Sequence, residues 1–483
     1  MKTLLILALA VLLTACNDKH TTDPGNDPGG NKPSPVNPEA VNLISNWNFE
    51  DDVDLTLAET PVQGKWSWMA GWDEKGTKGN AAEPYQDNRR GINNSRCLAI
   101  ISPNVNVDVG YAQVIKGLKP GEPYKAIARI RTEDVTGGAG AHLSLDYLWA
   151  PRSNPVTGTH TEYVTSVLEF EPEGDEITLM LKLGNTAADA RGVAYFDNVT
   201  LTYNYDLYQR LSPKEHIKLI IDKKYLSVSD AVIDDWLGKL DLVYESYVEQ
   251  FLGKKPYDGA TIKIRSGVIG AWAYAGNPIQ WNQNYIEQTL LQVAEGDWCF
   301  GLMHELGHDF NPGHMKGQYD QCPWQAWDFN EELFANFRMY YALCHVPGAQ
   351  ILQDAKIYKP DGTYTVEKKF YKGDEIKQMY KSETDNGYDQ TIAKGKAVEM
   401  GNGLTYCMVR IVDAFGWEIW QKTYDDLYKL PATAVNPSGW NQWQKFTYLL
   451  EALDKNAPEG RSVYDTFTTQ ELNVIKSYLS TQK

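Results

Sequence analysis

Two histidines lie four residues apart in the segment Gly-Leu-Met-His-Glu-Leu-Gly-His-Asp-Phe, at positions 304 and 308. Residues at this spacing share one face of an α-helix, so His304 and His308 can reach the same point in space. The segment is therefore predicted to be a helix beside a site that can hold a metal ion. Glu305 would lie next to that ion, where it can take a proton from a bound water molecule.

The limits of this helix can be predicted from its flanking residues. Asp297 is a suitable N-cap, and the run Asn-Pro-Gly at 311–313 is a stop signal. Leu302, Leu306 and Phe310 recur at helical spacing and should form the buried stripe. The two histidines then lie at the edge of that stripe, beside a cleft.

A catalytic zinc ion needs three protein ligands and one open position. The best source of the third ligand is a second helix predicted within residues 327–341. Asp328 is its expected N-cap, with Glu331 as the partner in a capping box. Glu332 is then free to bind the metal, and Asn336, one turn later, is predicted to support the site from outside the ligand set. Glu331 remains the alternative ligand.

His314 offers another way to complete the site. It lies six residues after His308, which is the spacing of the third ligand in metzincin proteases. That family has a glycine three residues after the second histidine, where this chain has Asn311, a residue that also tolerates positive φ. Gly313 is displaced from the expected position and no convincing Met-turn follows. Glu332 is therefore the preferred ligand and His314 the alternative.

Residues 1–16 resemble a bacterial lipoprotein signal peptide. A positive Lys2 precedes an apolar run that is too short to span a bilayer, and the run ends in Leu-Thr-Ala-Cys at 13–16. This lipobox-like ending implies cleavage before Cys16 and a lipid on its thiol. The protein is then expected to be exported and anchored by the lipid to the bacterial outer membrane, at the cell surface; an ordinary secretory signal is the alternative. Residues 17–40, rich in Pro, Gly and Asn, are predicted to be a flexible linker.

The charge of the chain restricts its partners. The formal net charge of −17 opposes binding to nucleic acid and to anionic membrane surfaces, so membrane contact is expected only through the lipid anchor. Five cysteines remain besides Cys16, and an odd number leaves at least one that is free or pairs between chains.

Residues 41–205 and 206–483 differ in pattern, which predicts a multidomain protein. The first range has short alternating runs broken by Gly, Pro and Asn, typical of an all-β sandwich. The second has mainly helical periodicity with a few strands, such as the run at 260–265, and is predicted to be a mainly α, or α+β, domain.

Three segments of the first range resemble the jelly-roll carbohydrate-binding modules of bacterial glycan-degrading enzymes: residues 42–50, 117–124 and 195–201. The resemblance implies a jelly-roll sandwich. It also implies a structural calcium ion held by Glu50 and Asp197, whose hard oxygen atoms suit that ion. The alternative is that both are ordinary surface carboxylates.

Trp66, Trp68 and Trp72 are the candidate sugar-binding residues of this range. Trp66 and Trp68 are two residues apart and should face the same side of a strand. They would form a platform on which sugar rings stack, although core packing is the alternative for each of them.

Three segments of the second range resemble enhancin-like metallopeptidases, a gluzincin family that includes mucin-degrading peptidases of gut bacteria. They are residues 273–279, the Trp-led segment 296–308, and Glu-Leu-Phe-Ala-Asn at 332–336. The chain departs from the family at Tyr274, where His is usual, and at Asn277, where Tyr is usual. The resemblance implies a gluzincin-type domain in which zinc is the cofactor.

The metal residues implied by this resemblance are His304, His308 and Glu332, with Glu305 as the base. The predicted function is a surface-anchored zinc endopeptidase that hydrolyses peptide bonds of glycoproteins, with mucin-type O-glycosylated proteins as the substrate class. The alternatives are a metzincin-like protease that uses His314 and a non-catalytic surface glycan-binding lipoprotein. Glu305 argues against the last, because a site that only holds a metal has no use for a base.

Overall fold

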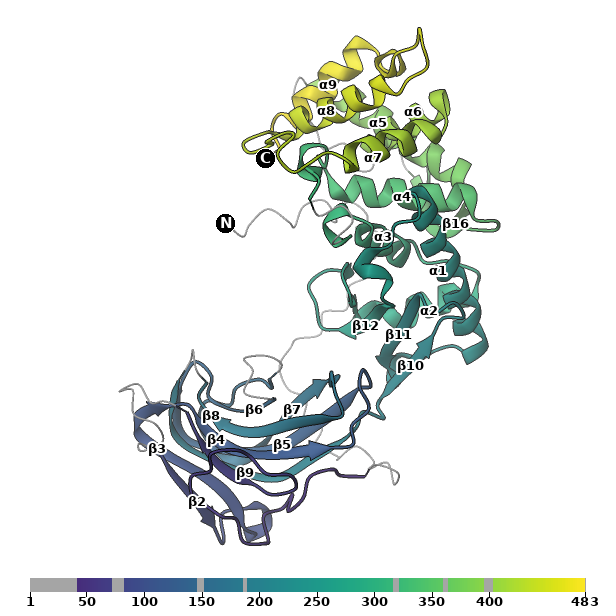
Figure 1. The fold of residues 1–483 in the computed structure, drawn as a ribbon. Coiled ribbons are helices and arrows are strands. Elements are labelled where there is room, and N and C mark those ends of the chain that lie inside the picture. The colour runs from purple at the N-terminus through teal and green to yellow at the C-terminus, as the bar shows by residue number, and fades with distance from the viewer. Residues whose placement is uncertain are drawn as a thin grey trace. The chain divides into compact units, whose positions relative to one another are not determined.

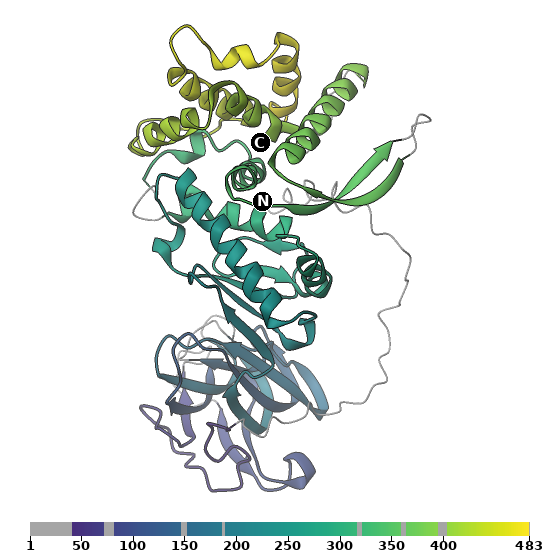
Figure 2. The same cartoon turned by 90° about the vertical axis from the view of Figure 1, so that its right-hand side faces the viewer.

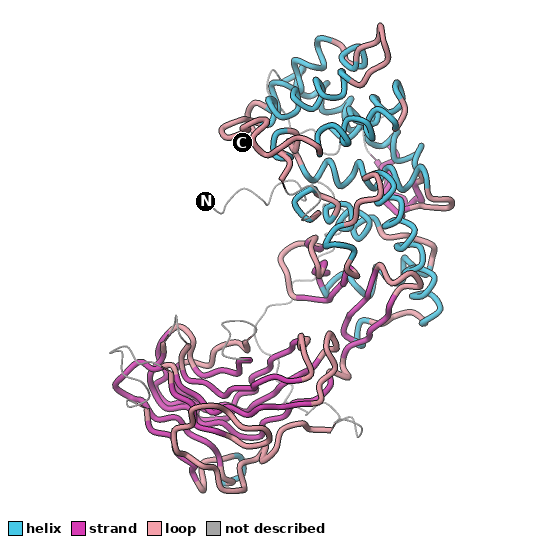
Figure 3. The backbone as a smooth tube through the Cα atoms, in the orientation of Figure 1, coloured by secondary structure: helices cyan, strands magenta, loops and turns pink. Residues whose placement is uncertain are grey.

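The computed structural model describes residues 41–71, 82–145, 152–185, 189–315, 321–358, 364–394 and 403–482. Cys16 and Trp72 lie outside these ranges. The chain divides into two compact units between Leu207 and Tyr208. Strands make up the first unit and helices dominate the second (Figure 3). Within the described residues, no disulfide joins the cysteines, and no helix is both long and apolar enough to cross a bilayer.

The first unit is a sandwich of two antiparallel sheets with the strand orders β1-β4-β8-β6 and β2-β3-β9-β5-β7 (Figure 1). The strands of the first sheet are β1 (Ser67–Ala70), β4 (Val109–Lys116), β8 (Glu176–Leu183) and β6 (Ala141–Leu145). Those of the second are β2 (Glu83–Asp87), β3 (Cys97–Val107), β9 (Ala190–Tyr203), β5 (Tyr124–Gly137) and β7 (Gly158–Phe170). The predicted all-β sandwich is confirmed.

The core of the sandwich follows from the period of two along its strands. In β5, buried and partly exposed side chains alternate from Tyr124 to Thr132, so every second side chain points between the sheets. Leu98 of β3, Phe196 of β9 and Leu181 of β8 fill the same layer.

Trp66 and Trp68 belong to this core, so the predicted sugar platform is wrong for both. Their side chains are only 4% and 2% exposed. The ring of Trp66 packs on Phe49 at 5.7 Å between centroids, and that of Trp68 packs on Tyr111 at 5.1 Å. They do face the same side of the chain, as predicted, but that side is the interior, where burial of a large apolar surface is most favourable.

Replacing Trp68 with alanine should lower the free energy of unfolding by about 3–5 kcal/mol, because the deletion leaves a large cavity in the core. Urea unfolding of the full chain, followed by circular dichroism and fluorescence, measures this. Trp47, which is 42% exposed, gives the matched control, and W47A should change the value by less than about 0.5 kcal/mol. A W68A protein of unchanged stability would contradict the core role.

The second unit begins with a mixed five-stranded sheet of order β10-β11-β12-β14-β13. Its strands are β10 (Leu207–Leu211), β11 (Ile217–Asp222), β12 (Ile262–Gly267), β14 (Ile279–Asn282) and β13 (Ala273–Tyr274). β12 is parallel to both β11 and β14, whereas β13 is antiparallel to β14 and ends the strand order.

Nine helices and a hairpin complete the described part of this unit. The helices are α1 (Asp230–Gln250), α2 (Gln283–Ala294), α3 (Phe300–Asp309), α4 (Glu331–His345), α5 (Gly373–Lys394), α6 (Gly403–Phe415), α7 (Glu418–Tyr428), α8 (Gln442–Lys455) and α9 (Thr469–Leu479). The hairpin of β15 (Ile351–Tyr358) and β16 (Tyr364–Tyr371) extends away from the helices (Figure 2). The mainly helical α+β domain is confirmed, although the hairpin was not predicted.

The predicted start of α3 is wrong by two residues. Cys299, with a φ of 69°, takes the N-cap position, and the helix begins at Phe300. The carboxylate of Asp297 instead accepts hydrogen bonds from the backbone N–H groups of Cys299 (3.0 Å) and Leu352 (2.8 Å). Asp297 therefore joins the start of α3 to β15. The predicted stop is confirmed, because α3 ends at Asp309.

The predicted capping box of α4 is also wrong. Asn330, not Asp328, is the N-cap, and its side chain accepts from the backbone N–H of Leu333. Asn is as good an N-cap as Asp, so the choice between them depends on the surrounding structure. Asp328 instead contacts the side chain of Asn311, at 3.4 Å. Glu331 becomes the first residue of the helix and is free for another contact.

Candidate metal centre

Helices α3 and α4 lie side by side and are held at close range (Figure 1). A Cβ at Gly307 would lie 2.9 Å from the backbone oxygen of Ala335, so glycine at this position lets the two backbones approach. Arg338 of α4 donates to the backbone oxygen of Gly307 (2.9 Å). From α1, the Tyr247 hydroxyl donates to the backbone oxygen of Met303 (2.9 Å). The helix that carries both histidines is therefore held by two neighbouring helices.

His304, His308 and Glu332 converge on one point. One potential ligand atom from each lies within 4.8 Å of the others, and no other such group of three His, Cys, Asp or Glu side chains occurs among the described residues. Nε2 of His304 lies 3.0 Å from Nε2 of His308 and 3.2 Å from Oε2 of Glu332. Nε2 of His308 lies 3.6 Å from the same oxygen. Two imidazoles and one carboxylate are a donor set that fits a divalent metal ion.

Asn336 contacts the far side of the first histidine. Its Oδ1 lies 2.9 Å from Nδ1 of His304, so Nδ1 donates and Nε2 is left to face the common point. This is the arrangement in which an outer amide fixes the tautomer and orientation of a ligand imidazole. The structure thus brings Asn336 to the side of the site where the sequence predicts it.

Glu331 lies behind the second histidine rather than among the three converging side chains. Its Oε1 is 3.5 Å from Nδ1 of His308 and forms an ion pair with Arg338. Burial alone would lower the pKa of His308, but hydrogen bonds and charge from Glu331 and Glu332 raise it to about 10. The same negative charge that favours a proton on His308 favours a metal cation in its place.

Glu332 and Glu305 have opposite electrostatic environments. Burial would raise the pKa of the Glu332 carboxyl, but the two imidazoles lower it well below its usual range. Burial raises the pKa of the Glu305 carboxyl, against the opposing charges of the imidazoles and a hydrogen bond from the backbone N–H of Ala275. Glu332 is thus suited to bind a cation, and Glu305 is suited to accept a proton.

His314 lies outside the converging group. Its ring stacks on Tyr257 with 5.3 Å between centroids and an interplanar angle of 25°. The structure therefore gives no support to His314 as the third ligand.

Glu50 and Asp197 serve as hydrogen-bond acceptors in the sandwich. Asp197 is buried and accepts from the backbone N–H groups of Ile92 and Asn198, both at 2.7 Å. Glu50 is exposed and accepts from the backbone N–H of Arg96 (3.1 Å). Burial, with a smaller effect of Glu50, raises the pKa of Asp197. Calcium at this position stays a prediction.

A row of four side chains on the outer face of the five-stranded sheet, two of them tyrosines, was not predicted from the sequence. The register pairs Tyr85, Ala99, Tyr195 and Arg131 across four adjacent strands. The Arg131 guanidinium lies 4.4 Å from the ring centroid of Tyr195 and covers it, so that ring is buried. The alternating pattern of β5 and β9 is the signal from which this row could have been found. Tyr85 is the exposed tyrosine of this row, and Tyr195 is the buried one.

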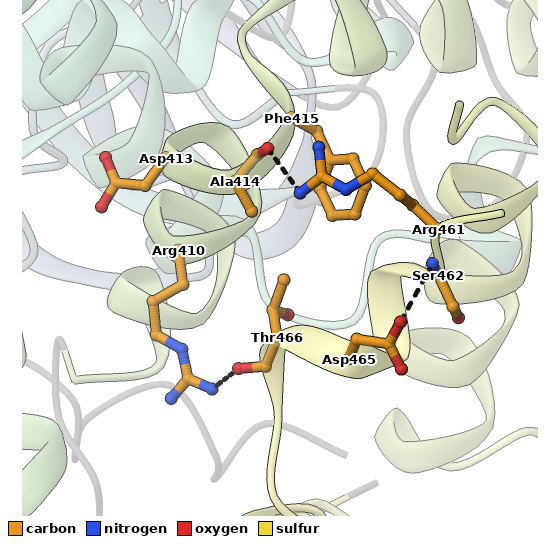
Figure 4. A pocket seen from close by; sticks show the side chains of 8 residues that line it. All are labelled: Arg410, Asp413, Ala414, Phe415, Arg461, Ser462, Asp465 and Thr466. Atoms are coloured by element: carbon orange, nitrogen blue, oxygen red, sulfur yellow. Dashed lines mark hydrogen bonds between the residues drawn. The ribbon is translucent and has the colours of Figure 1, made fainter. Parts of the chain in front are cut away.

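A cavity of about 370 Å³ lies away from these residues, between the end of α6 and residues 461–466 (Figure 4). Its charged groups have partners within the chain. Arg410 forms an ion pair with Glu471 at 2.7 Å, and Arg461 donates to the backbone oxygen of Ala414 (2.9 Å) while its guanidinium covers the ring of Phe415. None of the predicted site residues lines it, so its size is no guide to the chemistry of the chain.

No protein-family model matches this chain, and no curated protein matches its sequence. Among solved structures, a metallopeptidase from Bacteroides thetaiotaomicron is 12% identical, with 71% of this chain and 57% of that chain covered and a TM-score of 0.33. A CBM4 structure is 14% identical, with 33% and 99% covered and a TM-score of 0.22. TmCBM61 in complex with β-1,4-galactotriose is 15% identical, with 34% and 99% covered and a TM-score of 0.21. These similarities are distant, so the chemistry has to be inferred from the side chains of the site.

Proposed function

We propose that the chain is a zinc-dependent endopeptidase of the enhancin-like, gluzincin type. The observation that carries this proposal is the convergence of His304, His308 and Glu332 on one point, with the buried Glu305 on the same helix. Three nitrogen and oxygen ligands leave the fourth position of a tetrahedral zinc ion open for water or substrate. A site that only holds a metal would not need a buried base beside it.

Each residue of the site would have a distinct role in peptide hydrolysis. Zinc, when bound, supplies Lewis-acid polarisation of the substrate carbonyl and lowers the pKa of its water. Glu305 accepts a proton from the attacking water and returns it to the leaving amine. Asn336 orients His304, and Glu331, held by Arg338, orients His308.

An extended polypeptide is the substrate that the surrounding sheet favours. β13 ends the strand order and pairs with β14, and its Tyr274 is 47% exposed. An extended peptide can bind to such an edge by adding a strand. The backbone N–H of Ala275, directly after β13, lies close enough to Glu305 to lower its pKa, so the edge lies next to the base.

We further propose that the substrate is a glycoprotein of the mucin-type O-glycosylated class and that a lipid on Cys16 anchors the protein at the surface of the outer membrane. The support for the substrate is the resemblance of residues 273–279, 296–308 and 332–336 to enhancin-like peptidases, together with a jelly-roll sandwich in the same chain. The support for the anchor is the lipobox-like run at 13–16.

Incubation of the purified protein with a mucin-type glycoprotein, before and after enzymatic removal of its glycans, tests this function. We expect cleavage of the glycosylated form, loss of cleavage with a zinc chelator, and recovery when zinc is added back. Equal cleavage of both forms would reject the glycoprotein specificity and leave a general protease. Sugar binding without cleavage of either form would favour a glycan-binding protein instead.

A further inference from the structure

The last residue of α3 makes a contact that the proposed mechanism does not use. Asp309 is fully buried. Its Oδ1 accepts a hydrogen bond from the backbone N–H of Gly276 (2.8 Å) and one from the hydroxyl of Tyr257 (2.8 Å). Its Oδ2 has no hydrogen-bond partner in the described part of the chain. Burying a carboxyl group costs free energy, and the two hydrogen bonds to Oδ1 offset part of that cost.

Asp309 and Glu305 lie beside two consecutive backbone amides. Glu305 and Asp309 are four residues apart on α3, so their side chains leave the same face of the helix. The backbone N–H of Ala275 lies close enough to Glu305 to lower its pKa, and the N–H of Gly276 donates to Asp309. Two carboxylates one helical turn apart therefore face two consecutive residues that directly follow the edge strand β13.

The residues that connect β13 to β14 have further features that fix their positions. Gly276 has a φ of 133°, which is readily accessible only to glycine. The next residue, Asn277, accepts from the backbone N–H of Lys263 (3.0 Å) and donates to the backbone oxygen of Thr261 (3.0 Å). Two consecutive residues are thus tied, Gly276 to α3 and Asn277 to the chain at β12.

We propose that Asp309 is a positioning residue that anchors the end of edge strand β13 to the metal-binding helix, so that a peptide bound along the strand meets Glu305 at a fixed distance. This inference rests on the proposed peptidase function. Displacement of the strand by about 1 Å would misplace the peptide relative to Glu305, and a shift of this size costs about 10²-fold in rate. The two imidazoles have their own supports in Asn336 and Glu331, so metal binding should not depend on Asp309.

The test compares three variants of the full chain. Asp309→Ala should lower kcat/KM for a peptide substrate by about 10²-fold, with a raised KM as well as a lowered kcat, and should keep its zinc. Asp309→Asn retains an acceptor for Gly276 and should stay within about fivefold of the unchanged protein. Tyr257→Phe removes only the second donor to Asp309 and should likewise stay within about fivefold. If D309A does not fold, D309S replaces it, since the serine hydroxyl is too short to reach Gly276.

Hydrogen exchange gives a second measurement that does not depend on catalysis. The amides of Ala275 and Gly276 should exchange faster in D309A than in the unchanged protein, and D309N should not differ from it. Loss of zinc in D309A, unchanged kcat/KM in a folded D309A, or failure of both D309A and D309S to fold would overturn the positioning role. If the unchanged protein cleaves no polypeptide, the proposed function fails, whereas faster exchange at these two amides would still support the anchor.

Discussion

Glu305→Gln should leave zinc bound and remove nearly all peptide hydrolysis. Glutamine has nearly the same size and shape as glutamate, but its amide cannot take a proton from water. Loss of a general base reduces the rate by about 10²–10⁴-fold, and we expect the upper part of this range because Glu305 is the buried carboxylate next to the three converging side chains. His304, His308 and Glu332 are unchanged, so zinc content should stay near one ion per chain.

The measurements are kcat/KM with a fluorogenic peptide and bound zinc by elemental analysis. Glu295→Gln gives a matched control, because Glu295 is an exposed glutamate at the end of α2 and the same change there should leave both values unaltered. An E305Q protein that keeps a tenth or more of its activity would show that another group acts as the base. An E305Q protein that loses its zinc would assign Glu305 to metal binding.

The two histidines could be predicted because the physical cause of their meeting is local. A spacing of four on a helix brings two side chains to one face whatever the rest of the chain does. Leu302 and Leu306 are buried, as the same periodicity predicts. The alternating runs of the first unit are a local signal of the same kind, and they predicted its sandwich.

The predictions that were wrong concern features that depend on contacts between distant parts of the chain. A period of two shows that Trp66 and Trp68 share a face but not which face, and this is decided by pairing of β1 with β4, about forty residues further on. At α4, Asp328 and Asn330 both suit the N-cap. Sequence alone does not reveal that Asp328 contacts Asn311, which leaves the cap to Asn330.

The assignment of the metal ligand to one of the two adjacent glutamates depends only in part on spacing along the sequence. Glu332 was predicted as the ligand because Glu331 was expected to belong to a capping box, and that reason is wrong. The signal for the actual role of Glu331 was available, since Arg338 lies seven residues on and therefore two turns along the same helix face. The contacts of Ala275 and Gly276 with α3 leave no such trace in the sequence.

Glu332→Gln should abolish tight zinc binding, whereas His314→Asn should leave it unchanged. Removing the Glu332 charge takes away the carboxylate that both imidazoles contact, at 3.2 and 3.6 Å. Changes in the supports of metal ligands cost about 10–100-fold in affinity, so loss of a ligand should cost more than 10²-fold. His314 stacks on Tyr257 outside the converging group, so H314N should bind zinc within about threefold of the unchanged protein.

Glu331→Gln distinguishes the two glutamates. Glu331 faces Nδ1 of His308, the nitrogen that points away from the other two side chains, so its loss should weaken zinc binding by about 10–100-fold, less than the loss of Glu332. Zinc dissociation constants from competition with a chelator rank the three variants, and the expected order of weakening is E332Q, E331Q, H314N. If H314N loses zinc while E332Q keeps it, the third ligand is a histidine, and the site is metzincin-like. The opposite result means that the ligands come from two helices, α3 and α4, which approach each other closely at Gly307.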